Sequence, residues 1–343
     1  MLIIFSFIVL IMLFSFRIHR HGLDEQYLSK FYTSSIKGIF VLLVFMKHAG
    51  DYVEITTAGD LFAMKPIYYL GQLIVAMFLF YSGYGVYESV KRKGTSYVNH
   101  FPTNRLLKTF IDFSFAVSLF YVLGEFIRNH HSLSQFFWSL TGWDSVGNSN
   151  WYMFAIFILY IFTYVGFKIF QKKKFLSLLA ILFMTLCYVF VLSTLQPRRF
   201  SNTVLCYCAG MFYSYFKSDI DEVLKKYNVL YYVLFAVIIA IYLYLYPMMY
   251  RHIIIHNFLS ISFNLIIVFA SMKISFQSKI FDWCGQHLFW IYILQRLPMK
   301  LLVYWNVNEI SPLIFVLTSF VTTVLMANYI KIMMDKFKNS IIA

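Results

Sequence analysis

Residues 151–170 read WYMFAIFILYIFTYVGFKIF, a run in which Lys168 is the only charged side chain. A transmembrane α-helix needs about 20 consecutive, mostly apolar residues to cross the hydrocarbon core of a bilayer, so this run predicts a membrane span. Comparable apolar runs recur along the chain, separated by short polar segments. They predict eleven spanning helices, at about 2–16, 37–54, 67–89, 109–127, 151–170, 175–195, 200–216, 229–247, 254–272, 283–297 and 312–331.

The composition of the whole chain also indicates a membrane protein. Of its 343 residues, 60% are hydrophobic and 13% are charged, against about 45–50% and about 25% in soluble domains. One water-soluble core cannot bury this apolar surplus, so lipid must solvate much of the surface. We therefore predict an all-α, polytopic integral membrane helix bundle. We expect segment 1–29 to add an uncleaved N-terminal helix and a cytoplasmic loop to a ten-helix membrane domain at 30–343.

The positive charge of the chain is distributed as a topology signal. The net charge is +14, and the basic residues form short clusters between apolar runs, such as 91–93 and 172–174. With segment 90–108 in the cytoplasm, 21 of the 29 Lys and Arg residues fall on the cytoplasmic side. The positive-inside rule then predicts a multi-pass plasma-membrane protein with its N-terminus outside and its C-terminus cytoplasmic. No basic stripe or nucleic-acid motif is present, so we expect no nucleic-acid partner.

The predicted span 37–54 carries the most unusual polar side chains, which are Lys37, Lys47, His48 and Asp51. Such residues are costly inside a membrane and often functional. Helical geometry puts Lys37 and His48 on one face, about 16 Å apart along the axis. We expect Lys37 at the cytoplasmic surface, His48 deep in the membrane as a catalytic base, and Asp51 near enough to orient its ring. A lone histidine bonded to a neighbouring helix is the alternative.

Two further pairs of residues can each be interpreted as structural or as functional. Arg105 and Lys108, spaced by three residues, could clamp phosphates or simply anchor the helix on the cytoplasmic side. Ser82 and Gly83 are small residues that let helices approach closely, which on its own indicates packing.

Together these residues resemble the acyltransferase-3 family of membrane-bound O-acyltransferases. That family has a basic residue, usually Arg, separated by ten intervening residues from an essential histidine, which matches Lys37 and His48. The order of its other motifs matches Ser82-Gly83-Tyr84, the pair Arg105 and Lys108, Asn150-Trp151-Tyr152, and Gly285 with Ile291 and Tyr292. The chain departs from the family pattern where Lys37 and Lys108 replace Arg, and where Leu288 and Gln295 replace the common Ser and His.

The resemblance implies an acyltransferase that moves an acetyl or other acyl group from cytoplasmic acyl-CoA to a hydroxyl of an envelope or capsular polysaccharide. It implies acetyl-CoA as donor substrate and no bound cofactor. Lys37, Arg105 and Lys108 would hold the CoA phosphates, and His48 would act as general base or carry the acyl group covalently. Ser82, Gly83, Tyr84, Asn150, Trp151 and Tyr152 would shape the site. A transporter or flippase for a lipid-linked glycan is the main alternative, and a structural subunit the third.

Other polar residues give weaker signals. His252 and His256 have a possible metal-ligand spacing, but no Cys or carboxylate completes a site, so we expect surface or interface histidines and no metal. The four cysteines lack metal-ligand spacing. Asp144, Ser145, Ser149 and Asn150 in an outer loop could bind sugar hydroxyls or could shape the loop.

Overall fold

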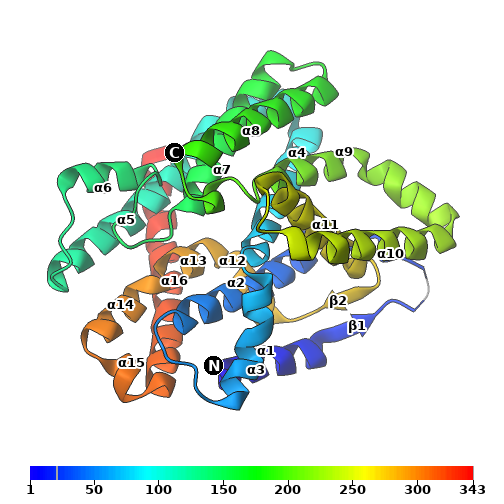
Figure 1. Ribbon diagram of the computed structural model, residues 1–343. Helices are drawn as coiled ribbons and strands as arrows, with labels where there is room; N and C mark the ends of the chain where they lie inside the picture. Colours follow the sequence, from blue (N-terminus) through cyan, green and yellow to red (C-terminus); the bar gives the residue numbers. More distant parts are fainter. Residues whose placement is uncertain (21, 343) are drawn as a thin grey trace.

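The computed structural model describes residues 1–20 and 22–342 as a bundle of helices of very different lengths (Figure 1). The helices of the first half are α1 (Leu2–Ser15), α2 (Lys30–Gly50), α3 (Ala58–Leu70), α4 (Leu73–Asn99), the π-helical turn η1 (Pro102–Leu107), α5 (Lys108–Phe126), α6 (Leu133–Leu140) and α7 (Trp151–Ile169). Those of the second half are α8 (Lys174–Leu195), η2 (Arg198–Phe200), α9 (Leu205–Lys226), α10 (Asn228–Leu245), η3 (Tyr246–Met248), α11 (Ile253–Ser271), α12 (Lys279–Gln286), α13 (Leu288–Leu294), α14 (Arg296–Tyr304), α15 (Val307–Ile310) and α16 (Pro312–Ile342). Two short strands, β1 (Phe16–Ile18) and β2 (Ile274–Phe276), pair antiparallel.

The predicted all-α membrane bundle is confirmed, whereas the number of eleven spans is not. Within the described part of the chain, seven helical segments are long and apolar enough to cross a bilayer. They contain α4, α5, α7, α8, α10, α11 and α16. Helices α2 and α9 have 21 and 22 residues but carry more polar side chains, and α1 has only 14.

Three predicted boundaries were wrong. The segment 67–89 is split at Gly71, whose φ of 49° ends α3 before α4 begins. Most of the expected outer loop 51–66 is therefore helical, as α3, and the expected loop 128–150 contains α6. The predicted span 283–297 consists of parts of three short helices, α12, α13 and α14.

Two pairs of helices pack with their backbones almost in contact. A Cβ atom on Gly38 of α2 would lie 1.9 Å from the carbonyl oxygen of Phe281 in α12, and one on Gly285 would lie 1.8 Å from that of Ser34. Helices α4 and α9 meet in the same reciprocal way through Gly83 and Gly210, where the corresponding distance is 2.0 Å for each. Small residues thus hold both pairs together, as is common between membrane helices.

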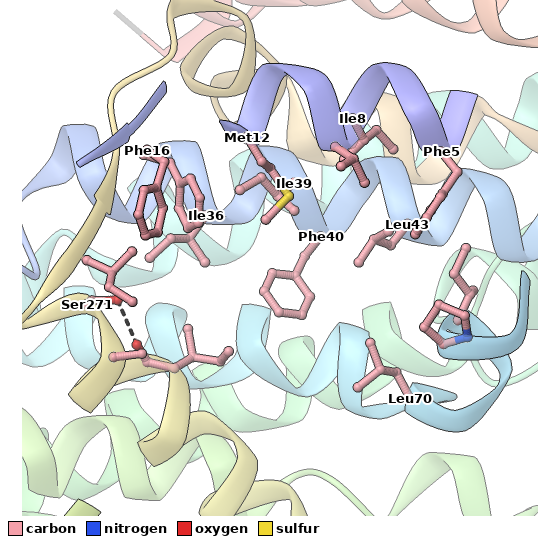
Figure 2. Close-up of a pocket in the computed structure, with 17 residues that line it drawn as sticks. Phe5, Ile8, Met12, Phe16, Ile36, Ile39, Phe40, Leu43, Leu70 and Ser271 are labelled. Carbon is pink, nitrogen blue, oxygen red and sulfur yellow. Dashed lines mark hydrogen bonds between the residues drawn. The ribbon is translucent and has the colours of Figure 1, made fainter. Parts of the chain in front are cut away.

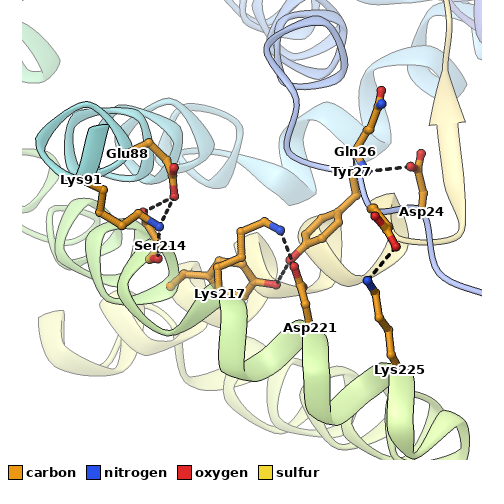
Figure 3. Close-up of polar contacts among 11 residues, drawn as sticks. Asp24, Gln26, Tyr27, Glu88, Lys91, Ser214, Lys217, Asp221 and Lys225 are labelled. Atoms are coloured by element: carbon orange, nitrogen blue, oxygen red, sulfur yellow. Dashed lines mark hydrogen bonds and ion pairs between the residues drawn. The ribbon is translucent and has the colours of Figure 1, made fainter. Parts of the chain in front are cut away.

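The loop between α1 and α2 is fastened to the basic end of the bundle. Figure 3 shows Tyr27 reaching α9, where its hydroxyl donates to Asp221 at 2.8 Å and lies 2.9 Å from the Tyr213 hydroxyl. Burial raises the pKa of Tyr27, so the phenol stays protonated as a donor. Asp221 is also paired with Lys217. This network and the β1–β2 pair bring together segments that the charge pattern assigned to one side of the membrane.

The glycine contacts generate a stability prediction with a matched control in the same helix. Gly83→Ala should destabilise the protein by about 1–3 kcal/mol, since its methyl group would collide with the backbone of Tyr207. Gly85→Ala should be neutral or stabilising, because nothing lies within 4 Å of the added carbon. Thermal unfolding in detergent micelles tests both, and equal melting temperatures for the two variants would contradict the close packing.

Candidate functional site

His48 lies in the wall of a polar cavity of 280 Å³ at the end of α2. The cavity is enclosed by α2, by the junction of α3 and α4, by the first residue of α7, and by α11 and α13 with the start of α14. Its lining combines aromatic and polar side chains, as small-molecule sites do. The residues that line it are Val44, Lys47, His48, Asp51, Leu70, Gly71, Gln72, Ile74, Val75, Trp151, Met249, Tyr250, His256, Tyr292 and Arg296.

Three side-chain nitrogens of this wall are buried and have no hydrogen-bond partner among the described residues. They are His48 Nδ1, His256 Nε2 and Arg296 Nε. His256 is 5% exposed, and its other ring nitrogen lies 3.3 Å from the carbonyl oxygen of Met249. A proton on that nitrogen makes the contact a hydrogen bond and leaves Nε2 as an acceptor. Because unpaired buried polar atoms are costly, this set indicates that a polar ligand completes the site.

Asp51 does not orient the His48 ring in this structure. Its carboxylate accepts a bond of 2.5 Å from Lys47 and lies 3.7 Å from the guanidinium of Arg296. The spacing of four residues brings Lys47 and Asp51 together on one helix face. Asp51 therefore holds two cations at the edge of the cavity, and no hydrogen bond joins it to the His48 side chain among residues 1–20 and 22–342.

A second polar cavity, of 310 Å³, lies between α5, α7, α13 and α16. Near the C-terminal end of α16, Lys338 bridges two carboxylates, at 2.6 Å from Asp112 and 3.3 Å from Asp335. Lys331 lies 3.9 Å from Asp335. These four residues all line the cavity, so it is a charged space inside an otherwise apolar bundle.

The two cavities share one wall, formed by Tyr292 of α13. Tyr152 lines the second cavity and packs edge-on against Tyr292, with ring centroids 5.5 Å apart. The cavities belong to opposite ends of the bundle. The first contains Gln72, which precedes α4, and the second contains Thr109 in the first turn of α5, after the chain has crossed along α4.

Ser82 and Arg105 come together around Tyr160, another residue of the second cavity. The Ser82 hydroxyl lies 3.3 Å from that of Tyr160, and the charge of Arg105 interacts with the same phenol. Arg105 Nε donates to Tyr97 at 3.1 Å. Lys37 is also within electrostatic range of Arg105. Five residues from α2, α4, η1 and α7 therefore lie close to one another.

Arg105 and Lys108 lie in and directly after a π-helical turn that we did not predict from the sequence. The segment Pro102–Leu107 is π-helical, and the Lys108 N–H donates to the carbonyls of Thr103 and Arg105. Insertions of this kind occur frequently at functional sites. The widened turn changes the direction of the basic pair relative to the regular helix that we expected.

Comparison with protein families now adds to this geometry. The family profile described as an acyltransferase domain, that of the acyltransferase-3 family, matches residues 31–329. The chain belongs to the acyltransferase-3 family. It is thus a membrane acyltransferase, with α1 outside the matched region. No curated protein and no solved structure matches the chain.

The remaining residues of the predicted site have different places in this acyltransferase. Trp151 faces the His48 cavity, whereas Tyr152 faces the second one. Asn150 is buried and donates to the Asp144 carbonyl at 3.2 Å, so it shapes the loop before α7. Gly83 serves the contact between α4 and α9, and Tyr84 is buried in the core.

Sequence reasoning missed Asp112, Lys338 and Arg296, and it treated His256 as an interface histidine. One signal was present in the sequence, since Asp112 falls inside the predicted span 109–127, where a carboxylate is costly. The other residues come from separate helices, and only their convergence in space marks them.

The position of His256 predicts a difference between two histidines of the same segment. His256→Ala should lower acyl transfer by about 10- to 100-fold at unchanged membrane abundance, because it removes a buried acceptor atom from the cavity wall. His252→Ala, in an exposed residue ahead of α11, should keep nearly wild-type activity. Comparable activity in the two variants, with equal melting temperatures, would show that His256 is not part of the site.

Proposed function

We propose that this acyltransferase moves an acyl group, most simply acetyl, from acyl-CoA at its basic end to a hydroxyl of an envelope or capsular polysaccharide at the opposite end. Arg105 and Lys108, which lie next to Tyr160 and Thr109 of the second cavity, suit the phosphates of a cytoplasmic donor. The two lysines of the cavity wall are already paired with Asp112 and Asp335. The smaller number of basic residues at the His48 end suits the outer face of the plasma membrane. The N-terminus is then outside and the C-terminus cytoplasmic.

The observation that carries this proposal is the shared wall at Tyr292. A donor bound at one end and an acceptor bound at the other would meet there, with only the acyl group exchanged between them. The second cavity extends from Lys338 to Tyr152, deep enough for an acyl thioester to approach this wall. His48 lines the cavity on the other side, where the acceptor hydroxyl would lie.

In this proposal His48 removes the proton from the acceptor hydroxyl. The resulting oxygen attacks the thioester carbonyl, the C–S bond breaks, and the CoA thiolate leaves toward the basic end and takes up a proton. A neutral imidazole can accept the proton, as a general base must. His256 Nε2 would accept, and Arg296 would donate, hydrogen bonds that orient the acceptor. Asp51 would hold Lys47 and Arg296 in place.

A transporter or flippase for a lipid-linked glycan is disfavoured by the same wall. Such a protein must pass a whole saccharide between its two ends, typically by alternating access around one site. Here Tyr152 and Tyr292 pack edge-on between two separate cavities. A small acyl group matches this arrangement better than a sugar does.

Replacement of His48 tests the chemical core of the proposal. His48→Ala should lower acylation of the surface polysaccharide by at least about 10²- to 10⁴-fold, which is the range of general-base catalysis. Asp51→Asn should reduce activity less, because its carboxylate contacts cations and not the His48 ring. The measurement is O-acyl content of the surface glycan by NMR at matched membrane abundance. His130→Ala, in an exposed loop histidine, is the control. Wild-type acylation by His48→Ala would remove it from the mechanism.

The donor end is tested separately by binding. Arg105→Ala and Lys108→Ala should each weaken acyl-CoA binding by on the order of 10- to 100-fold, since a charge-assisted contact contributes about 1.5–3 kcal/mol. Arg92→Ala is the control, because Arg92 is an exposed cation of α4 that neither lines a cavity nor adjoins a residue that does. Titration calorimetry in detergent gives the affinities. Unchanged binding in both cavity-end variants would reduce the pair to a membrane anchor.

A further inference from the structure

A third cavity, of 460 Å³, lies between α1 and the core and is almost entirely apolar. Figure 2 shows Phe5, Ile8 and Met12 pointing from α1 toward α2, with Leu70 and Ser271 at its two ends. The hydroxyl of Ser271 donates to the Ile267 carbonyl of its own helix at 2.7 Å, so its donor is already used.

The size, lining and shape of this cavity suit a hydrocarbon chain. Water gains no hydrogen-bond partners from an apolar wall, whereas a hydrocarbon chain in this hollow would make dispersion contacts with it. Its lining runs along the chain from Phe5 of α1 to Phe16, the first residue of β1, a distance of about 16 Å at the rise of a helix. The space is therefore elongated and spans about half the hydrocarbon thickness of a bilayer.

The hollow is built into the fold, because α1 is attached to the core at both ends. At one end, β1 pairs with β2 and Phe16 lies opposite Phe276. At the other end, the Leu2 N–H donates to Asp60 of α3 at 2.8 Å, and Phe5 packs edge-on against Phe62. Between these attachments the cavity lies along α1, bounded also by residues of α2, α3 and α11.

The apolar cavity is continuous in position with the His48 cavity. Leu70 lines both. On α2, Leu43 lines the apolar cavity, and the next residue, Val44, lines the polar one. A molecule with a hydrocarbon chain and a polar headgroup would fit across this boundary, with the headgroup beside His48.

We propose that this cavity binds the hydrocarbon chain of a lipid-linked acceptor, so that the saccharide headgroup is presented to His48 while still attached to its lipid. The inference rests on the proposed function and specifies the form in which the acceptor arrives. Helix α1, which lies outside the matched acyltransferase region, provides one wall of the chain site and so adds lipid selection to the family core.

Photolabelling of the full chain in phosphatidylglycerol and phosphatidylethanolamine vesicles tests this directly. The probe is a polyprenyl phosphate with a diazirine in its chain, and a phosphatidylglycerol with a diazirine in its acyl chain is the comparison. We expect the polyprenyl probe to label peptides of α1, α2 and α3, and unlabelled polyprenyl phosphate to compete. Equal labelling by the phospholipid probe, without competition, would overturn the proposal, since an ordinary bilayer lipid would then fill the cavity.

Variants of α1 connect binding with activity. Ile8→Trp and Met12→Trp, which fill the cavity, should each reduce polyprenyl labelling and glycan acylation at least tenfold. Leu13→Trp should change neither, because Leu13 is 68% exposed and does not line the cavity. Acylation at the wild-type level in both cavity variants would contradict the proposal. The His48→Ala variant separates the two hypotheses. If it acylates normally but the α1 labelling pattern holds, the catalytic assignment fails and the lipid site stands.

Discussion

The backbone contact between α2 and α12 is the constraint on which the site depends. Gly38 and Gly285 leave no room for a Cβ atom on either helix, and the Ser34 hydroxyl adds a bond of 3.1 Å to the Asp282 carbonyl. Helix α12 is followed directly by α13 and α14, which carry Tyr292 and Arg296. Fixing α12 against α2 therefore sets the distance between His48 and the residues that close its cavity.

The break of one predicted span into three helices follows from side-chain interactions that hydropathy does not record. His287 stacks on Trp283 with ring centroids 4.0 Å apart, and its Nδ1 lies 2.9 Å from the Trp283 carbonyl oxygen. This local bonding ends α12, and Gln295 ends α13. Helix α14 then begins with Arg296 at the cavity. The mean hydropathy of the segment indicates that it is buried, but not where its helices end.

The sequence predicts well those features that depend on the residues of one helix alone. The bundle class follows from the amount of apolar surface. His48 stands out because an ionisable group inside a membrane span is costly and usually functional. Asp51 shows what sequence spacing does not determine. It is close enough in sequence to orient His48, but its carboxylate accepts a hydrogen bond from Lys47 instead. His256, Lys338 and Tyr292 acquire their places only through contacts between helices, for which periodicity gives no signal.

The three cavities together suggest why a bundle of this kind can transfer a group without large motions. The larger part of each proposed ligand binds where the surroundings match its polarity. The phosphates bind at the basic end, a saccharide in the polar cavity, and a hydrocarbon chain beside α1. Only the acyl group has to reach the wall at Tyr292. A rigid wall is then an advantage, because it excludes water from the reacting thioester and limits hydrolysis. Close packing of α2 on α12 and of α4 on α9 provides that rigidity on both sides of the site.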